Sequence, residues 1–374
     1  MLDWQSNESH IFINPRMPSH DKNKLEYMLQ KFKLDAHIFL ATSGSTAIQS
    51  TDTKWVALKK SVFLTSARSV NQHLNCSKKD TFLNTLPPFH VGGLALFARA
   101  YLCEAQIIDL YHEDNRWNPK NFVQQLLTNK VTISSLVPTQ VYDLVHNQLS
   151  APPSLRFIVV GGGFLDQNLY EQARKLNWPL LPSYGMTECG SQIATASPNF
   201  AWHSGYPELT VLPHLDVSLT AEGKIEISGD SLLSCYILQT QDKVERIDPK
   251  IDGKIITSDI GEFKNNKLLI YGRMDENIKI NGENISLVRL QEILQQIANH
   301  SDCAIISLPD ARQGNKIAAV FLRAHTNVSN FVNLFNERVF PYERIAMTYY
   351  LDKIPRTELG KLKRNLITQE ICQQ

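Results

Sequence analysis

Residues 42–46 (TSGST) place four hydroxyl groups around one glycine. A glycine lets the backbone approach a ligand closely, and hydroxyl and backbone N–H groups can surround phosphate oxygens. The segment does not match the pattern GxxxxGK[ST], because no Gly-Lys-Ser/Thr follows it. A Ser/Thr/Gly cluster is also typical of an ordinary polar turn. It therefore indicates a phosphate-binding loop only together with other segments that point to the same chemistry.

Two further segments combine glycine, aromatic, hydroxyl and carboxylate groups. Residues 161–163 (GGG) follow the apolar run 156–160, and residues 183–188 (SYGMTE) follow the run 178–182. We expect both to emerge at one carboxyl edge of a sheet, where open α/β sheets bind ligands. An aromatic ring can stack on a base, a threonine can bind phosphate and a glutamate can hold Mg²⁺. The alternative is a glycine turn and a capped helix start.

The second half of the chain adds an acidic and a basic motif. Residues 258–262 (SDIGE) and 271–275 (YGRMD) each carry an aspartate, a residue type that can accept hydrogen bonds from ribose hydroxyls. Both segments are also compatible with hairpin turns. Residues 355–364 (PRTELGKLKR) are basic, and a lysine there can neutralise charge that develops on a carboxylate–phosphate centre. A solvated basic tail is the alternative.

In their order along the chain, these motifs resemble those of the acyl-adenylate-forming superfamily, which contains acyl-CoA synthetases, peptide-synthetase adenylation domains and luciferases. TSGST is similar to its phosphate loop, YGMTE to its adenine and magnesium motif, and SDIGEF to its ribose motif. GRMDENIKINGENI resembles its hinge segment and PRTELGK its catalytic lysine loop. The resemblance runs from Thr42 to Lys361, which is most of the chain.

The resemblance implies a role for each matching residue. The nucleotide- and coenzyme-binding set comprises Thr42, Ser43, Gly44, Ser45, Thr46, Lys54, Gly162, Gly163, Tyr184, Gly185, Asp259, Arg273 and Gly282. Within it, Tyr184 stacks on adenine, Asp259 binds the ribose with help from Arg273, and Gly282 lines the passage for the pantetheine arm. The catalytic set comprises Lys361, His90 and Thr187, while Glu188 holds the metal and Asp275 is the hinge.

The implied function is an ATP-dependent acid–CoA ligase that uses ATP, Mg²⁺ and coenzyme A. Residues 87–94 (PPFHVGGL) and 185–192 (GMTECGSQ) resemble the o-succinylbenzoate–CoA ligases of menaquinone synthesis. In that subfamily His90 would lie beside the acyl pocket, with Ser191 and Gln192 near its far end. Three alternatives stay open: another aryl- or acyl-CoA ligase, an adenylation enzyme that serves a carrier protein, and a catalytically impaired nucleotide-binding paralogue.

The phosphate loop departs from the superfamily pattern, which continues Gly-x-Pro-Lys. Here residues 47–50 (AIQS) follow, and the nearest lysine is Lys54. We interpret Lys54 as the displaced equivalent after a small insertion. The segment before Thr42 is also shorter than in most members of the superfamily.

The elements that must position these residues alternate between strand and helix patterns, which predicts an α/β fold with mainly parallel sheets. We expect strands at residues 37–41, 131–137 and 156–160, helices at 25–32, 61–74, 138–145 and 166–176, and a loop at 184–188; the helix at 166–176 is expected to carry its acid in the first turn. Short β-like runs then predict a β-rich subdomain at about 205–272, within an AMP-binding N-terminal domain of residues 1–273. A mobile α+β C-terminal domain, residues 274–374, is expected to contain a helix at 287–297 and strands at 303–308 and 317–322.

Composition limits the class of protein. The chain has 374 residues, 43% of them hydrophobic, and a formal net charge of +1, so no overall field favours nucleic acid. Six scattered cysteines without a CxxC pair suit a reducing compartment. The first residues do not resemble a secretory signal, and no run approaches the roughly 20 apolar residues that span a bilayer. We therefore expect a soluble cytoplasmic protein with small-molecule partners; a homo-oligomer stays open.

Overall fold

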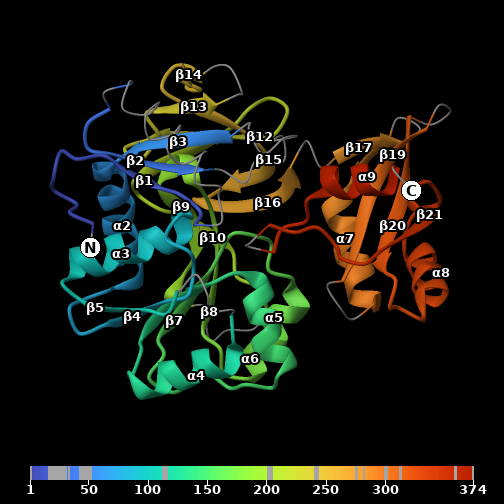
Figure 1. The fold of residues 1–374 in the computed structure, drawn as a ribbon, viewed down its shortest axis with the longest axis horizontal. Helices are drawn as coiled ribbons and strands as arrows, with labels where there is room; N and C mark the ends of the chain where they lie inside the picture. The colour runs from blue at the N-terminus through green and yellow to red at the C-terminus, as the bar shows by residue number, and fades with distance from the viewer. Residues whose placement is uncertain are drawn as a thin grey trace. The chain divides into compact units, whose positions relative to one another are not determined.

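A computed structural model describes residues 2–15, 32, 34–41, 53–111, 117–199, 205–239, 244–273, 277–280, 283–298, 302–310, 314–357 and 360–372. The chain divides into two compact units, drawn in Figure 1. The N-terminal unit comprises Met1–Thr220, Glu226–Ile256 and Glu262–Leu269. The C-terminal unit comprises Ala221–Ile225, Thr257–Gly261 and Ile270–Gln374. The expected domain boundary after residue 273 stays a prediction.

The smaller sheet of the N-terminal unit joins strands from distant parts of the chain. Within the described residues its order is β1-β2-β3-β13-β14. The strands are β1 (His10–Phe12), β2 (His37–Ala41), β3 (Thr53–Lys59), β13 (Cys235–Gln239) and β14 (Val244–Ile247). β13 runs antiparallel to β3, with Tyr236 opposite Val56 and Leu238 opposite Lys54. The strands within residues 235–247, part of the expected β-rich subdomain of about 205–272, complete a sheet with the first strands of the chain. The bounds of that subdomain stay a prediction.

The larger sheet has the order β11-β12-β15-β16-β10-β9-β8-β7-β6-β4-β5 in the described part of the chain. Its parallel part consists of β4 (Thr81–Asn84), β5 (Gln106–Asp109), β6 (Ile133–Leu136), β7 (Phe157–Val160) and β8 (Leu180–Met186). The remaining strands are β9 (Ser191–Ala196), β10 (Leu209–Val211), β11 (Leu215–Leu219), β12 (Lys224–Gly229), β15 (Ile255–Lys264) and β16 (Lys267–Arg273). The predicted α/β class is confirmed.

Helices cover both faces of the parallel strands, as buried parallel sheets require. The helices are α2 (Lys60–Leu74), α3 (Val91–Cys103), α4 (Pro119–Thr128), α5 (Pro138–His146) and α6 (Gln167–Lys175), visible in Figure 1. Side chains alternate along β7. Ile158 and Val160 pack in the core formed with α4, α5 and α6, whereas Val159 packs with Val70 and Leu74 of α2.

The C-terminal unit contains a three-stranded sheet of order β19-β20-β21. Its elements include β17 (Asn277–Ile280), β18 (Glu283–Ser286), α7 (Leu287–Ala298), β19 (Cys303–Asp310), β20 (Gly314–Leu322), α8 (Val328–Arg338), β21 (Ile345–Leu351) and α9 (Arg364–Cys372). Leu290 and Leu294 of α7 and Phe335 of α8 pack with Ile305 on one face of the sheet. Ile367 and Ile371 of α9 pack with Ile306 on the other.

Two expected features differ in the structure. Residues 184–186 were expected in a loop but form the end of β8, because β9 pairs with them in antiparallel register. Asp166 lies at the N-cap of α6 rather than in its first turn, and its Oδ1 accepts a hydrogen bond from the Leu169 N–H at 3.1 Å. The helix expected at 25–32 falls almost entirely outside the described residues. No described helix is long and apolar enough to cross a membrane.

Candidate active site

The candidate site of the N-terminal unit forms where β7 and β8 end. These strands are parallel neighbours, with Val160 paired to Pro182. Gly161, Gly162 and Gly163 follow β7 directly, and Gly162 has a φ of 76°. Tyr184 and Gly185 belong to β8, which continues into a 3₁₀ turn, η1 (Thr187–Cys189). The two glycine- and tyrosine-containing motifs therefore meet at one edge of the sheet.

The turn η1 is tied to the segment that leads into β13. The Leu233 N–H donates to the Glu188 carbonyl oxygen at 2.7 Å, and the Ser231 hydroxyl donates to the Cys189 carbonyl oxygen at 3.2 Å. Both bonds fix the backbone on which Thr187 and Glu188 stand. The position of the Glu188 side chain is therefore coupled to a segment more than 40 residues further along the chain.

The Glu188 carboxylate has two partners from the smaller sheet. The Tyr236 hydroxyl donates to Glu188 Oε1 at 2.9 Å, and Lys54 Nζ lies 3.6 Å from the same oxygen. Lys54 Nζ also lies 4.2 Å from the centroid of the Tyr236 ring, within the range of a cation–π contact. Lys54 and Tyr236 are diagonal neighbours on one face of the β3–β13 pair. The three side chains thus form one polar cluster.

Burial and charge set the protonation of this cluster. The Glu188 side chain is 13% exposed and that of Lys54 is 36% exposed. Burial, together with the neighbouring Glu188 carboxylate, raises the pKa of the Tyr236 hydroxyl well above its ordinary value. The hydroxyl therefore keeps its proton near neutral pH and acts as a hydrogen-bond donor to Glu188.

These residues fit a magnesium ion that arrives with a nucleotide. The described residues contain no group of three or more His, Cys, Asp or Glu side chains that could hold a metal ion. Mg²⁺ commonly binds through one or two carboxylates together with substrate phosphates and water. The second carboxylate oxygen of Glu188, Oε2, takes part in neither contact described above. A single carboxylate of this kind could complete the shell of a phosphate-bound ion.

Tyr236 was not among the residues that the sequence motifs singled out. Its only sequence signal is an aromatic residue in the short apolar run CYIL. Lys54, in contrast, was predicted from its place after the phosphate loop, and the structure brings it to Glu188. Thr42, Ser43, Gly44, Ser45 and Thr46 lie outside the described residues, so their predicted contact with phosphate stays a prediction.

His90 is the N-cap of α3, and its ring lies 4.8 Å from that of Phe89, centroid to centroid.

Two turns further along α3, Arg99 is 2% exposed. Its Nη2 donates to the Ser135 hydroxyl at 3.0 Å and its Nη1 lies 3.5 Å from Gln192 Oε1. Burial lowers the pKa of Arg99 to about 10, which leaves it charged at neutral pH. Among the described residues, Arg99 Nε has no hydrogen-bond partner and no carboxylate forms a salt bridge with this side chain.

The predicted ribose residues meet within the C-terminal unit. Asp259 lies on β15 and Arg273 is the last residue of β16. Arg273 Nη1 is 3.6 Å from Asp259 Oδ1, and the Asp259 side chain is 11% exposed. Residues 258–262 lie within β15 rather than in a hairpin turn. Residues 271–273 end β16, and residues 274 and 275 lie outside the described residues, so the alternative for that segment stays open. Asp275 and Gly282 lie outside the described residues, and their predicted roles stay predictions.

Lys361 stands on a tight loop of the C-terminal unit. The Thr357 N–H donates to the Lys361 carbonyl oxygen at 2.8 Å, and the Lys361 N–H donates to the Thr357 hydroxyl at 3.1 Å. Arg356 Nη1 donates to the Gly360 carbonyl oxygen at 2.8 Å. These bonds close the loop while the Lys361 residue stays exposed.

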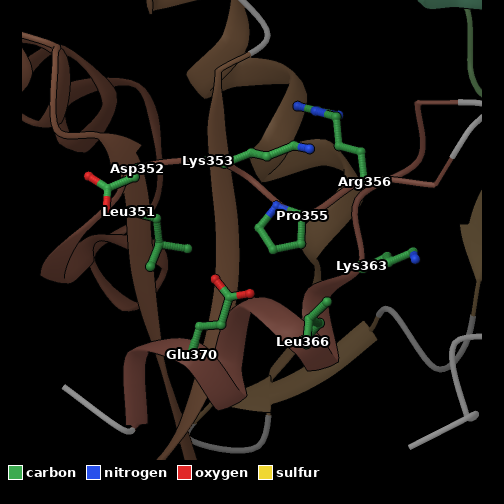
Figure 2. Close-up of a pocket in the computed structure, with 8 residues that line it drawn as sticks. All are labelled: Leu351, Asp352, Lys353, Pro355, Arg356, Lys363, Leu366 and Glu370. Atoms are coloured by element: carbon green, nitrogen blue, oxygen red, sulfur yellow. The ribbon is translucent and has the colours of Figure 1, made fainter. Parts of the chain in front are cut away.

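A cavity of about 630 Å³ lies beside this loop. Figure 2 shows Lys353, Arg356 and Lys363 around it, with Glu370 approaching from α9. The lining contains both cations and carboxylates, and it includes neither Lys361 nor any predicted site residue of the N-terminal unit. The cavity therefore gives no support to a role in the chemistry of Glu188.

Comparison with known proteins gives one family and a set of consistent relatives. The model of the family described as AMP-binding enzyme matches residues 19–237, more than half of the chain. A 2-succinylbenzoate–CoA ligase of Lactococcus lactis subsp. lactis (strain IL1403) is 26% identical over 318 residues, covering 79% of this chain and 65% of the relative. One of Staphylococcus epidermidis (strain RP62A) is 26% identical over 362 residues, covering 95% and 73%. The chain thus spans about two thirds of the length of such relatives.

Solved structures with the same fold include o-succinylbenzoate CoA synthetase (MenE) from Bacillus subtilis. Its complex with the acyl-adenylate intermediate OSB-AMP matches with a TM-score of 0.74 and 25% identity, over 88% of this chain and 68% of that chain. Its complex with ATP and magnesium ion matches with a TM-score of 0.73 and 25% identity, over 88% and 69%. The structure of McyG A-PCP complexed with phenylalanyl-adenylate, at 20% identity and a TM-score of 0.73, covers 91% of this chain and 67% of that chain, and shares the fold.

Proposed function

Because the chain belongs to the AMP-binding enzyme family, we propose that it is an ATP-dependent acid–CoA ligase that activates o-succinylbenzoate. In the first half-reaction a carboxylate oxygen bonds to the α-phosphorus of ATP and pyrophosphate leaves. In the second, the thiol of coenzyme A attacks the acyl carbon and AMP leaves. The use of ATP and coenzyme A supports a cytoplasmic location.

The observation that carries this proposal is the Glu188 carboxylate at the edge of the parallel sheet, together with its two partners. When bound, Mg²⁺ neutralises part of the charge that keeps a carboxylate and a triphosphate apart. Glu188 supplies an oxygen to hold it, and Lys54 supplies a cation within reach of the same place. Thr187, on the same turn, is proposed to bind the α-phosphate, with Tyr184 against adenine. Lys361 is proposed to bridge the attacking carboxylate and the phosphate.

Arg99 supports an acid with a second carboxylate. Among the described residues Arg99 has no acidic partner, and a buried guanidinium in that state is costly. A substrate anion that pairs with it would therefore bind strongly. o-Succinylbenzoate has two carboxylates, one that is activated and one that can be held. Gln192, which lies 3.5 Å from Arg99, belongs to the segment expected near the far end of the acyl pocket. The relatives named as 2-succinylbenzoate–CoA ligases agree with this choice.

The test is ATP–pyrophosphate exchange with o-succinylbenzoate and with a panel of aryl and alkyl monocarboxylic acids. We expect exchange with o-succinylbenzoate, followed by thioester formation when coenzyme A is added. Exchange without thioester would favour an adenylation enzyme that serves a carrier protein. ATP binding without exchange for any acid would favour the catalytically impaired paralogue.

The Arg99→Met variant tests the substrate assignment separately. Replacing a buried charge by an apolar side chain of similar length is often neutral or stabilising, so the variant is expected to fold. The KM for o-succinylbenzoate should rise roughly 10- to 100-fold, since a charged hydrogen-bonded pair is worth about 1.5–3 kcal/mol. Arg99→Lys should recover part of this loss. An unchanged KM in a folded Arg99→Met variant would remove Arg99 from the acid-binding site.

A further inference from the structure

The Lys54–Glu188–Tyr236 cluster contains two groups that respond differently to a divalent cation. The hydroxyl of Tyr236 is neutral, so its bond to Glu188 Oε1 is compatible with a metal ion on the same carboxylate. Lys54 is a cation 3.6 Å from that oxygen, and it would repel a metal ion bound there. One partner can therefore stay when the metal arrives, while the other is displaced toward a different anion.

The surroundings of Lys54 allow such a displacement. Its side chain is 36% exposed, and its contact with Glu188 is longer than an ordinary hydrogen bond. Lys54 is the second residue of β3, directly after the segment that contains the motif TSGST. A long side chain at the beginning of a strand can turn toward a ligand without a change in the strand pairing.

The surroundings of Tyr236 make it a fixed support. It is the second residue of β13, and its neighbours in register are Val56 on β3 and Ile247 on β14. The chain that leads to it also holds the backbone of η1 through the Leu233 and Ser231 hydrogen bonds. The segment 231–236 thus holds both the backbone of η1 and the carboxylate of Glu188. This fixes the direction in which Glu188 Oε2 points.

We propose that Tyr236 is a positioning residue that holds Glu188 for the metal, and that Lys54 is an exchangeable counter-ion that moves from Glu188 to a nucleotide phosphate when Mg²⁺–ATP binds. This inference rests on the proposed function for its ligands, ATP and Mg²⁺. It does not depend on which acid is activated. The exchange gives the Glu188 carboxylate a cationic partner before Mg²⁺–ATP binds.

The tyrosine arm of the test uses Tyr236→Phe, which removes the hydroxyl and keeps the ring under Lys54. We expect the Mg²⁺ concentration that half-saturates ATP binding to rise about tenfold, as is usual when a metal ligand loses its supporting hydrogen bond. ATP binding in EDTA should not change. The matched control is Tyr170→Phe, because the Tyr170 hydroxyl is buried and has no hydrogen bond among the described residues. Equal Mg²⁺ requirements in wild type and Tyr236→Phe would overturn the positioning role.

The lysine arm uses Lys54→Met and two ligands measured separately. Mn²⁺ alone, followed by electron paramagnetic resonance, should bind roughly two- to fivefold more tightly, since a competing cation has been removed. ATP in EDTA, followed by calorimetry, should bind about tenfold more weakly, because a charged contact to phosphate is lost. The matched control is Lys254→Met, which breaks another Lys–Glu pair of 3.6 Å in the same unit.

The proposed exchange of Lys54 requires that Lys54→Met tightens Mn²⁺ binding and weakens ATP binding. If Lys54→Met leaves Mn²⁺ binding unchanged or weakens it, Lys54 does not compete with the metal and the proposal fails. If wild type binds Mg²⁺–ATP as proposed but neither variant differs from its control, the inference fails and the proposed function stands. If wild type binds no ATP under any condition, both fail together.

Discussion

At the residue scale, His214 connects burial to the pH dependence of stability. It is 7% exposed, and burial lowers its pKa to about 4 from an ordinary value of 6.5. The unfolded chain therefore binds the proton more readily than the folded one. The stabilisation is complete above pH 6.5 and is lost progressively as the pH falls toward 4, by up to roughly 3 kcal/mol.

Urea unfolding at pH 7 and pH 4.5 checks this prediction. The unfolding free energy of wild type should fall between the two pH values by roughly 2–3 kcal/mol more than that of His214→Gln. The exposed His146 on α5 provides the control, as His146→Gln should show the same fall as wild type. Identical pH dependence in wild type and His214→Gln would show that another group is responsible.

At the element scale, the β8–β9 pair depends on a glycine. A Cβ atom at Gly185 would lie 2.0 Å from the Ser191 carbonyl oxygen and 3.0 Å from the Gln192 Cα. Ser191 itself has a φ of 133°, which is unusual for a residue with a side chain. The chain returns so closely after η1 that only backbone atoms fit between the two strands.

We expect Gly185→Ala to lower the unfolding free energy by about 3 kcal/mol or more, because the clash is with backbone that cannot move without separating β8 from β9. Nucleotide binding should be lost with it, since Glu188 stands on the turn between these strands. Gly163→Ala is the control: its Cβ would meet Pro138 Cγ at an ordinary 3.5 Å, so a change within about 0.5 kcal/mol is expected. Chemical denaturation of both variants distinguishes them, and a fully stable Gly185→Ala would contradict the packing argument.

Local sequence patterns predicted the strands and helices whose buried face is defined by their own side chains. The apolar run at β7 and the helix at α2 lie where periodicity placed them, since each buries a face that its own sequence defines. The end of β8 could not be predicted in this way. Tyr184 and Met186 are extended because β9 pairs with them, and the polar composition of YGMTE instead suggested a loop.

The same limit explains which part of the candidate site was missed. Glu188 was singled out because it belongs to the motif YGMTE, and Lys54 because it is the nearest lysine after the phosphate loop. Tyr236 reaches Glu188 because β13 pairs with β3, a contact across some 180 residues that no local pattern reports. A strand that joins a sheet from a distant part of the chain is set by register, and register is decided by tertiary packing.

At the scale of the whole molecule, the predicted machinery is divided between two compact units. Glu188 and Lys54 belong to the N-terminal unit, whereas Lys361 belongs to the C-terminal unit. The proposed metal-binding carboxylate and the proposed catalytic lysine are therefore carried by separately packed parts of the chain, and the predicted ribose residues Asp259 and Arg273 share the unit of Lys361. A change at Lys361 should affect the chemical step without affecting the cores that position Glu188.

We expect Lys361→Ala to reduce ATP–pyrophosphate exchange about 100-fold or more, the usual cost of losing one charge-stabilising group in a transition state. The Kd for Mg²⁺–ATP should stay within about threefold, and stability within about 0.5 kcal/mol, because Lys361 is exposed on its loop. Lys363→Ala is the matched control: it removes a second exposed lysine of the same segment, one that lines the cavity of Figure 2, and should retain wild-type exchange. Equal losses in both variants would point to the general charge of the segment rather than to Lys361, and a loss of ATP binding in Lys361→Ala would place this lysine in nucleotide binding instead of catalysis.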